Sequence, residues 1–143
     1  MREIDQFSKV VGSMLTFNEM IKCGCKHIAL GTPTPDPLVR DEYMEHAVVI
    51  CEEAGTKCCP ENGGLITDLF PVSMNKGKYN ILFYEEDIYR DLYFSIKERK
   101  ERLVNENRYS GKERTMLAYE FGRLLSYSDA AIKRMIAENP ELE

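Results

Sequence analysis

The fold is decided by residues 26–59, KHIALGTPTPDPLVRDEYMEHAVVICEEAGTKCC. This stretch begins with a short apolar run at 26–31, which predicts a buried strand, and it ends with a second short candidate strand. Between them, Asp36 and Pro37 predict the start of a helix, because aspartate caps a free N–H group and a proline at the first helical position loses no hydrogen bond. Gly55 predicts the end of that helix. The stretch is therefore predicted to form a strand–helix–strand unit.

Strand–helix–strand units of this length join parallel strands through a right-handed crossover, so part of the sheet is expected to be parallel. Two further candidate strands follow at residues 65–70 (LITDLF) and 79–84 (YNILFY), and a glycine-containing turn precedes each of them. The predicted fold class is α/β. It is a small two-layer or three-layer domain with a partly parallel sheet of three or four strands and a helical C-terminal third.

Helices are predicted on both sides of this region. Apolar residues recur every three or four positions over residues 2–22, and the same spacing begins again after Glu86 and continues through most of the remaining chain. The sequence thus predicts a single domain over residues 1–143. We expect an α/β core at 1–85 and a helical C-terminal extension at 86–143 that packs on the core.

The composition indicates a globular protein and excludes several classes. Hydrophobic residues make up 43% and charged residues 30% of the 143 residues, unlike disordered or fibrous chains. A formal net charge of −5 disfavours whole-surface attraction to nucleic acid or to an anionic membrane, while a local basic patch stays open. No apolar run approaches the roughly 18 residues that span a bilayer, and the N-terminus lacks a secretory signal pattern. We therefore expect a cytoplasmic protein without a membrane partner.

The five cysteines are an odd number, which argues against a secreted disulfide framework and for a reducing compartment. Cys23 and Cys25 form a CxC pair, and Cys58 and Cys59 are adjacent. Structural zinc sites usually separate paired ligands by two to four residues, so this spacing predicts no metal site and favours free thiols. Which of these thiols is reactive is left open.

The first candidate ligand site is the loop between the strand at 26–31 and the helix that follows. Ligands of open α/β sheets bind at the carboxyl ends of the strands, where such loops gather, and a helix N-terminus favours anions. Gly31, Thr32 and Thr34 supply backbone and hydroxyl groups, and Arg40 supplies a positive charge. A stiff proline-rich connector explains the same residues.

The second candidate is the segment from Glu61 to Asp68, where Gly63 and Gly64 allow close approach by a ligand. Glu61, Asn62 and Asp68 are polar groups beside the predicted sheet. In a parallel sheet this segment would lie near the first loop, and an acid, a threonine and an arginine would form a small polar site. A surface turn between two strands is the simpler interpretation.

These two segments predict a protein that binds a small anionic or nucleotide-like ligand at the carboxyl ends of its strands. The sequence contains no nucleophile motif of the GxSxG type, and it singles out no catalytic residue and no cofactor. Enzymatic activity therefore stays undetermined at this stage.

The C-terminal third leaves a second function class open. Residues 121–136 (FGRLLSYSDAAIKRMI) place small and apolar residues at spacings typical of a helix-turn-helix, whose second helix enters the major groove of DNA. A nucleic-acid-binding regulator is therefore the alternative function. Two acidic residues of that helix offset Lys133 and Arg134, and an antiparallel helical hairpin explains the pattern as well.

A stretch of mixed charge at residues 97–102 (KERKER) has the i,i+4 pairing of a solvated helix face. Together with Arg108, Lys112 and Arg114, it would also form a local basic strip for RNA or for a phosphorylated ligand.

Aromatic residues cluster between Tyr79 and Phe94, in larger number than one helix–strand contact requires. Because aromatic side chains are enriched at subunit interfaces, we expect a homo-oligomer. A structural or partner-binding subunit is the third function class that the sequence leaves open.

Overall fold

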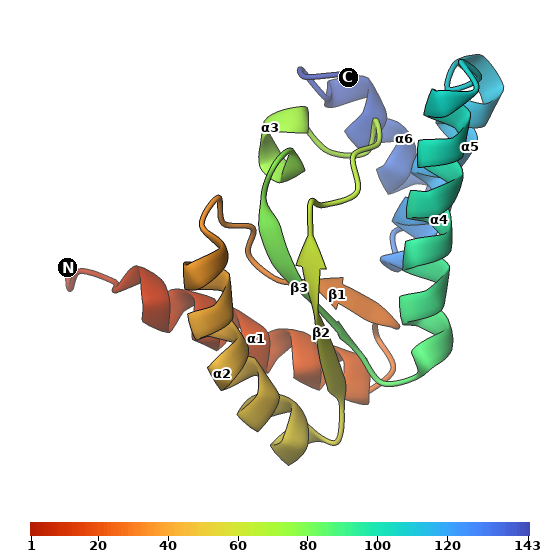
Figure 1. The fold of residues 1–143 in the computed structure, drawn as a ribbon. Coiled ribbons are helices and arrows are strands. Elements are labelled where there is room, and N and C mark those ends of the chain that lie inside the picture. The colour runs from red at the N-terminus through yellow and green to blue at the C-terminus, as the bar shows by residue number, and fades with distance from the viewer. The chain divides into compact units, whose positions relative to one another are not determined.

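The computed structural model describes residues 1–143, and the chain divides into two units (Figure 1). The α/β unit contains Met1–Gly64 and Gly77–Glu85, and the helical unit contains Leu65–Lys76 and Glu86–Glu143. The helices predicted after Glu86 are present, and the helical unit takes in residues 65–76 as well. The organisation of both units as one domain stays a prediction.

The α/β unit has two helices and one three-stranded sheet. Its elements in chain order are α1 (Gln6–Lys22), β1 (Ile28–Leu30), α2 (Pro37–Ala54), β2 (Lys57–Asn62) and β3 (Tyr79–Tyr84). The strand order is β1-β3-β2, and both outer strands pair antiparallel with β3. The fold is thus mixed α/β, as the sequence predicts, but with an antiparallel sheet.

The prediction of a partly parallel sheet is wrong. β1 and β2 run in the same direction, as a crossover through α2 requires, but β3 lies between them and opposes both. The sequence of β3, YNILFY, is buried from Asn80 to Tyr84, and a continuous apolar run suits a central strand. β2 contains Pro60, which has no N–H to donate and is tolerated at a sheet edge. The result is a split strand–helix–strand unit.

The strand predicted at residues 65–70 is also absent. Leu65 and Leu69 are buried in the helical unit, where the N–H of Leu65 donates to the hydroxyl of Tyr93 (3.1 Å). The hydroxyl of Thr67 accepts the N–H of Leu69 (3.2 Å) and closes a local turn. The segment therefore buries its apolar side chains without joining a sheet.

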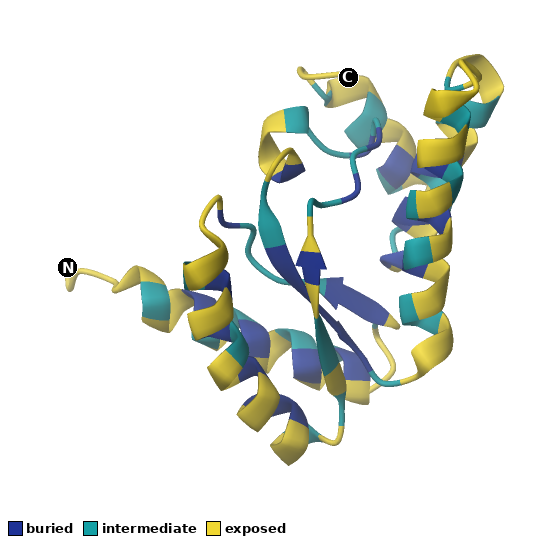
Figure 2. Ribbon diagram, viewed as in Figure 1, coloured by how far each residue is buried: buried dark blue, intermediate teal, exposed yellow.

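The core of the α/β unit lies between the two helices and one face of the sheet. Every second residue of the sheet contributes to it, together with residues spaced by three or four along each helix (Figure 2). The buried members are Val10, Met14, Ile21, Ala29, Tyr43, Ala47, Ile50, Cys51, Ile81 and Phe83. The α/β unit is thus a two-layer structure.

The predicted signals at the ends of α2 are confirmed. The carboxylate of Asp36 accepts the N–H of Leu38 (2.9 Å), and Pro37 occupies the first helical position. Gly55 ends the helix in the left-handed conformation (φ 72°), which favours glycine. These local contacts fix where the chain leaves β1 and where it enters β2.

The helical unit contains α3 (Val72–Asn75), α4 (Asp87–Asn105), α5 (Gly111–Leu124) and α6 (Asp129–Glu138). Most of its buried side chains come from α4, α5, α6 and the segment before α3. They include Leu69, Tyr93, Ile96, Leu117, Phe121, Leu125 and Ile132. The rings of Tyr93 and Phe121 meet edge to face at 5.9 Å, a geometry that aromatic pairs prefer.

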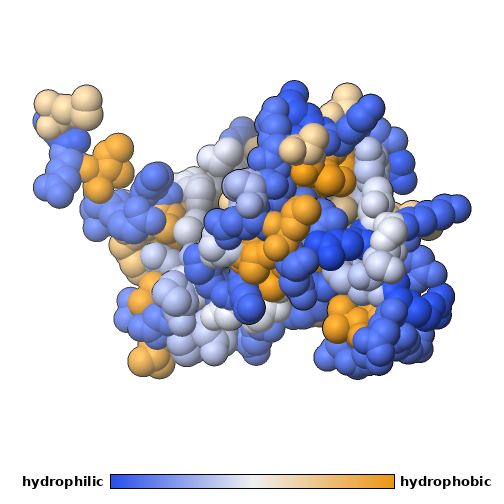
Figure 3. Space-filling model, turned by 90° about the horizontal axis from the view of Figure 1, so that it is seen from above, coloured by the Kyte–Doolittle hydropathy of each residue, from blue (hydrophilic) through white to orange (hydrophobic).

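No helix combines the length and the apolar character that a membrane crossing requires. On the face drawn in Figure 3, hydrophobic residues form separate patches among hydrophilic ones. Isolated exposed apolar residues of this kind are normal on protein surfaces.

Candidate functional site

The strand ends of the α/β unit meet at Arg40, which lies in the first turns of α2 and is only 7% exposed. Its Nη1 donates to the side-chain oxygen of Asn62 (2.9 Å) and to the backbone carbonyls of Glu61 (3.2 Å) and Asn80 (3.4 Å). Its Nε donates to the carboxylate of Asp41 (2.8 Å). The guanidinium therefore ties the end of β2 to the beginning of β3.

Three other predicted ligand residues, Gly31, Thr32 and Thr34, follow β1 in the chain. The N–H of Gly31 donates to the carbonyl of Ile81 (2.8 Å), which extends the pairing of β1 with β3. Thr34 forms an isolated bridge with Tyr79 through two backbone hydrogen bonds of 2.9 and 2.8 Å. Thr32 lies half-buried between these two positions.

Gly63 follows β2 with a φ of 71°, and its N–H donates to the carbonyl of Lys78 (3.1 Å). The turn after β2 requires this left-handed conformation, which glycine adopts without strain. The structure thus brings Arg40, the backbone of Glu61 and Asn62 into contact, while Oε2 of the buried Glu61 side chain accepts no hydrogen bond. That this cluster binds a ligand stays a prediction.

Asp68, the remaining predicted ligand residue, lies in the helical unit and pairs with Arg114 of α5. Arg114 Nη2 lies 2.6 Å and its Nε 2.8 Å from the two carboxylate oxygens. The ring of Tyr109 stacks 5.1 Å from the Arg114 guanidinium, and its burial together with the Asp68 carboxylate raises the pKa of Tyr109 to about 12. Asp68 is consequently a partly buried partner of an arginine.

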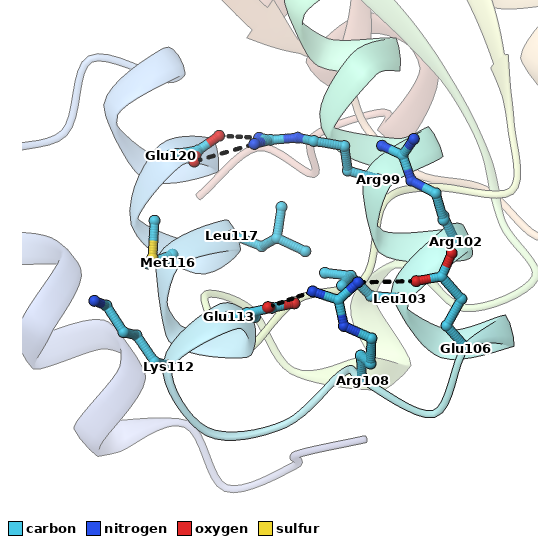
Figure 4. A pocket seen from close by; sticks show the side chains of 10 residues that line it. All are labelled: Arg99, Arg102, Leu103, Glu106, Arg108, Lys112, Glu113, Met116, Leu117 and Glu120. Atoms are coloured by element: carbon cyan, nitrogen blue, oxygen red, sulfur yellow. Dashed lines mark hydrogen bonds and ion pairs between the residues drawn. The ribbon is translucent and has the colours of Figure 1, made fainter.

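A groove in the helical unit separates the facing sides of α4 and α5 (Figure 4). Its volume is about 660 Å³, within the range of sites that hold small molecules. It is lined by four basic, three acidic and three apolar residues. These are Arg99, Arg102, Arg108, Lys112, Glu106, Glu113, Glu120, Leu103, Met116 and Leu117.

Two sets of ion pairs cross the groove, as Figure 4 shows. At one end Arg99 pairs with Glu120, and at the other Arg108 pairs with Glu113 (2.8 Å) and Glu106 (3.0 Å). These carboxylates hold the pKa of Arg108 above its usual value. Paired in this way, the arginines keep defined positions at the two ends of the groove.

Arg102 and Lys112 also line the groove, but neither side chain has a hydrogen bond or ion pair with another residue. In addition, the Nε of Arg99 is buried without an acceptor. Leu117 lies between the two sets of ion pairs, and Leu103 lies beside Arg108 (Figure 4). The groove thus has two positively charged side chains without a protein partner, next to an apolar wall.

The chain matches no protein-family model, no curated protein and no solved structure.

The predicted helix-turn-helix pattern corresponds to α5, a four-residue turn and α6. A Cβ added at Gly122 would lie 2.5 Å from Cγ1 of Ile132, so the two helices approach closely at this point. Ser126 adopts a positive φ of 69° in the turn, and the hydroxyl of Ser128 accepts the N–H of Ala131 (3.2 Å) as a helix cap. The α5–α6 pair is thus closely packed and its second helix is capped; that it binds nucleic acid stays a prediction.

The sequence predicted the cations of the groove but not the groove itself. Arg99, Arg102, Arg108 and Lys112 all belong to the predicted basic strip. The residues contributed by the middle of α5, among them Glu120, were missed. Their only sequence signal is the spacing of Glu113 and Glu120, which lie seven residues apart and therefore on one helix face.

Proposed function

We propose that the protein binds a small phosphorylated, nucleotide-like ligand in the groove between α4 and α5. The observation that carries this proposal is that Arg102 and Lys112, two cations without a protein partner, line a groove of about 660 Å³ with an apolar wall. A ligand with an anionic and an apolar part matches both kinds of surface.

The charges of the groove favour an anionic ligand over a cationic one. The groove is lined by four basic and three acidic residues, so its local balance is positive although the whole chain is acidic. Hydrogen bonds from arginine or lysine to phosphate are charge-assisted and about twice as strong as neutral ones. The carboxylates of Glu113 and Glu120 hold neighbouring arginines in place, which lowers the cost of ordering them around a ligand.

The groove accounts for an anionic ligand better than the cluster at the strand ends does. There Arg40 already donates to two side chains and to two backbone carbonyls. A phosphate would have to replace these bonds. In the α4–α5 groove, Arg102 and Lys112 have no bonds to lose.

The proposal predicts that the substitutions Arg102→Gln and Lys112→Gln together weaken binding by at least about 100-fold. Each substitution removes a charge-assisted contact worth roughly 1.5–3 kcal/mol, and each 1.4 kcal/mol corresponds to a factor of ten in affinity. The measurement is thermal stabilisation of the full chain by nucleoside mono-, di- and triphosphates and by inorganic pyrophosphate, followed by calorimetric titration of the probe with the largest effect.

The matched control carries Lys133→Gln and Arg134→Gln, which remove the same charge from exposed positions of α6 outside the groove. This variant is expected to bind the probe as the original chain does. The proposal fails if no phosphorylated probe stabilises the original chain, or if both double variants lose affinity equally.

A second candidate function, binding of nucleic acid through α6, is favoured by the close crossing at Gly122 and the cap at Ser128. The exposed Lys133 and Arg134 would contact phosphates. Under this hypothesis Lys133→Gln with Arg134→Gln weakens binding to a DNA duplex and makes the affinity less dependent on salt. Unchanged mobility of duplex DNA at low salt would eliminate it.

Two finer expectations belong to the proposal. A cytoplasmic location is supported by five free cysteines, which a reducing compartment preserves.

Homo-oligomer formation is supported by Ile88 and Leu92, which lie four residues apart on α4 and are 58% and 45% exposed. Light scattering over a concentration series tests this expectation.

A further inference from the structure

Two exposed thiols lie side by side where α1 ends. Cys23 is the C-terminal cap of α1, and Cys25 follows after one glycine. Their sulfur atoms are 3.4 Å apart. A disulfide requires a separation of about 2.05 Å, so a movement of little more than 1 Å would join them.

Gly24 provides the room for that movement. Its φ of 83° is in the left-handed region, which turns the chain sharply between the two cysteines. No atom lies within 4 Å of the position that a Cβ would take at Gly24. No side chain therefore packs against Gly24, while the N–H groups of Gly24 and Cys25 donate to the carbonyls of Ile21 (3.1 Å) and Met20 (2.9 Å).

We propose that Cys23 and Cys25 are a site of reversible oxidation, which forms an intramolecular disulfide by exchange with a low-molecular-weight disulfide such as glutathione disulfide. This site lies in the α/β unit and does not depend on the function proposed for the groove.

The exchange takes place in two steps that balance. The thiolate of Cys23 attacks one sulfur of glutathione disulfide, breaks its S–S bond and releases one glutathione, which takes up a proton. Cys25 then gives up its proton and attacks the Cys23 sulfur of the mixed disulfide, which releases the second glutathione. Two electrons pass from the protein thiols to glutathione disulfide, and the chain loses two hydrogen atoms.

The hydrogen bond between the two thiols supports this order of steps. That bond, with the charge of a Cys23 thiolate, raises the pKa of Cys25, because the thiolate stabilises the proton on its neighbour. Cys25 therefore keeps its proton while Cys23 attacks, and it is placed to resolve the mixed disulfide afterwards.

Cys51 and Cys58 are less suited to exchange with a small disulfide in solution. Cys51 is only 4% exposed, and its thiol lies 3.5 Å from the side-chain oxygen of Asn18. Its hydrogen bond to Cys58 lowers the pKa of Cys51 and raises that of Cys58. Access rather than acidity limits Cys51, because exchange requires direct attack on a sulfur atom of the incoming disulfide.

The test equilibrates the full chain with glutathione buffers of increasing oxidised fraction, quenches with acid and locates the products by peptide mass mapping. We expect nearly complete loss of two hydrogen atoms from the peptide that contains Cys23 and Cys25. The Cys25→Ser variant is expected to stop at a mixed disulfide with one glutathione on Cys23. A control with Cys58→Ser and Cys59→Ser should oxidise at Cys23 and Cys25 as the original chain does.

Three outcomes would overturn the proposal. The two thiols could stay reduced in fully oxidised glutathione, they could end as two separate mixed disulfides, or they could cross-link different chains. Because the decisive measurement uses the unmodified chain, it does not depend on whether any variant folds.

Discussion

The substitution Gly122→Ala is expected to lower the free energy of unfolding by about 2–3 kcal/mol, the cost of overpacking a filled core. The added Cβ would lie 2.5 Å from Cγ1 and 2.7 Å from Cδ1 of Ile132. Ile132 is completely buried and β-branched, so its side chain has little freedom to move aside. Because the chain has no tryptophan, urea unfolding is best followed by circular dichroism.

Gly12→Ala is the matched control, since Gly12 also lies inside a helix but no atom lies within 4 Å of its Cβ position. There alanine is expected to stabilise the chain by about 0.5–1 kcal/mol through its higher helix propensity. Adding Ile132→Ala to Gly122→Ala should cost less than the sum of the single changes. If Gly122→Ala instead stabilises the chain as Gly12→Ala does, the close crossing of α5 and α6 is contradicted.

The substitution Arg40→Met is expected to lower the free energy of unfolding by about 3 kcal/mol. Methionine keeps most of the apolar side chain but leaves the carbonyls of Glu61 and Asn80 and the side chain of Asn62 without their donor. Each buried acceptor that loses its hydrogen bond costs roughly 1–3 kcal/mol. Arg40→Lys is expected to recover only part of the loss, because one ammonium group cannot reproduce the geometry of the guanidinium.

The control for Arg40 is Arg123→Met. Arg123 makes two hydrogen bonds of 2.8 Å to the carboxylate of Asp129. The side chains of Arg123 and Asp129 are each more than half exposed. Loss of such a surface pair is expected to cost less than about 1 kcal/mol. Equal effects at the two arginines, with loss of ligand binding in Arg40→Met alone, would make Arg40 a binding residue rather than a structural one.

Features encoded by adjacent residues were predictable from the sequence. The cap at Asp36, the proline at the first turn of α2 and the left-handed Gly55 depend on the chain within a few residues of each. The cap at Ser128 was predictable for the same reason. Helix ends are determined locally, because the unsatisfied N–H and C=O groups there find partners close by in the chain.

The arrangement of the strands was not predictable in this way. The strand–helix–strand pattern predicts the shared direction of β1 and β2, and the structure has it. Nothing within residues 26–59 indicates that β3 inserts between them, because that choice depends on a strand that follows much later. The error at residues 65–70 has a similar cause, since an apolar run buries equally well as an irregular segment.

The candidate site likewise depends partly on local sequence and partly on long-range packing. The sequence predicted that Glu61 lies near the loop before α2 if the sheet is parallel. In the antiparallel sheet, the hydrogen bonds of Arg40 to the ends of β2 and β3 depend on the position of β3. The groove depends on which faces of α4 and α5 meet. That choice follows from the turn after α4, where Asn107 has a positive φ of 55°, and from the long-range pairing of Arg99 with Glu120.

Mapping of backbone amide chemical shifts shows directly whether a phosphorylated ligand binds in the groove between α4 and α5. The full isotope-labelled chain would be titrated with adenosine diphosphate and, in parallel, with inorganic pyrophosphate. Binding in the groove predicts saturable shifts at residues 99–106 and 112–120, which disappear when Arg102→Gln and Lys112→Gln are combined. Shifts confined to residues 31–40 and 61–63, or no saturable shifts with either probe, would contradict it.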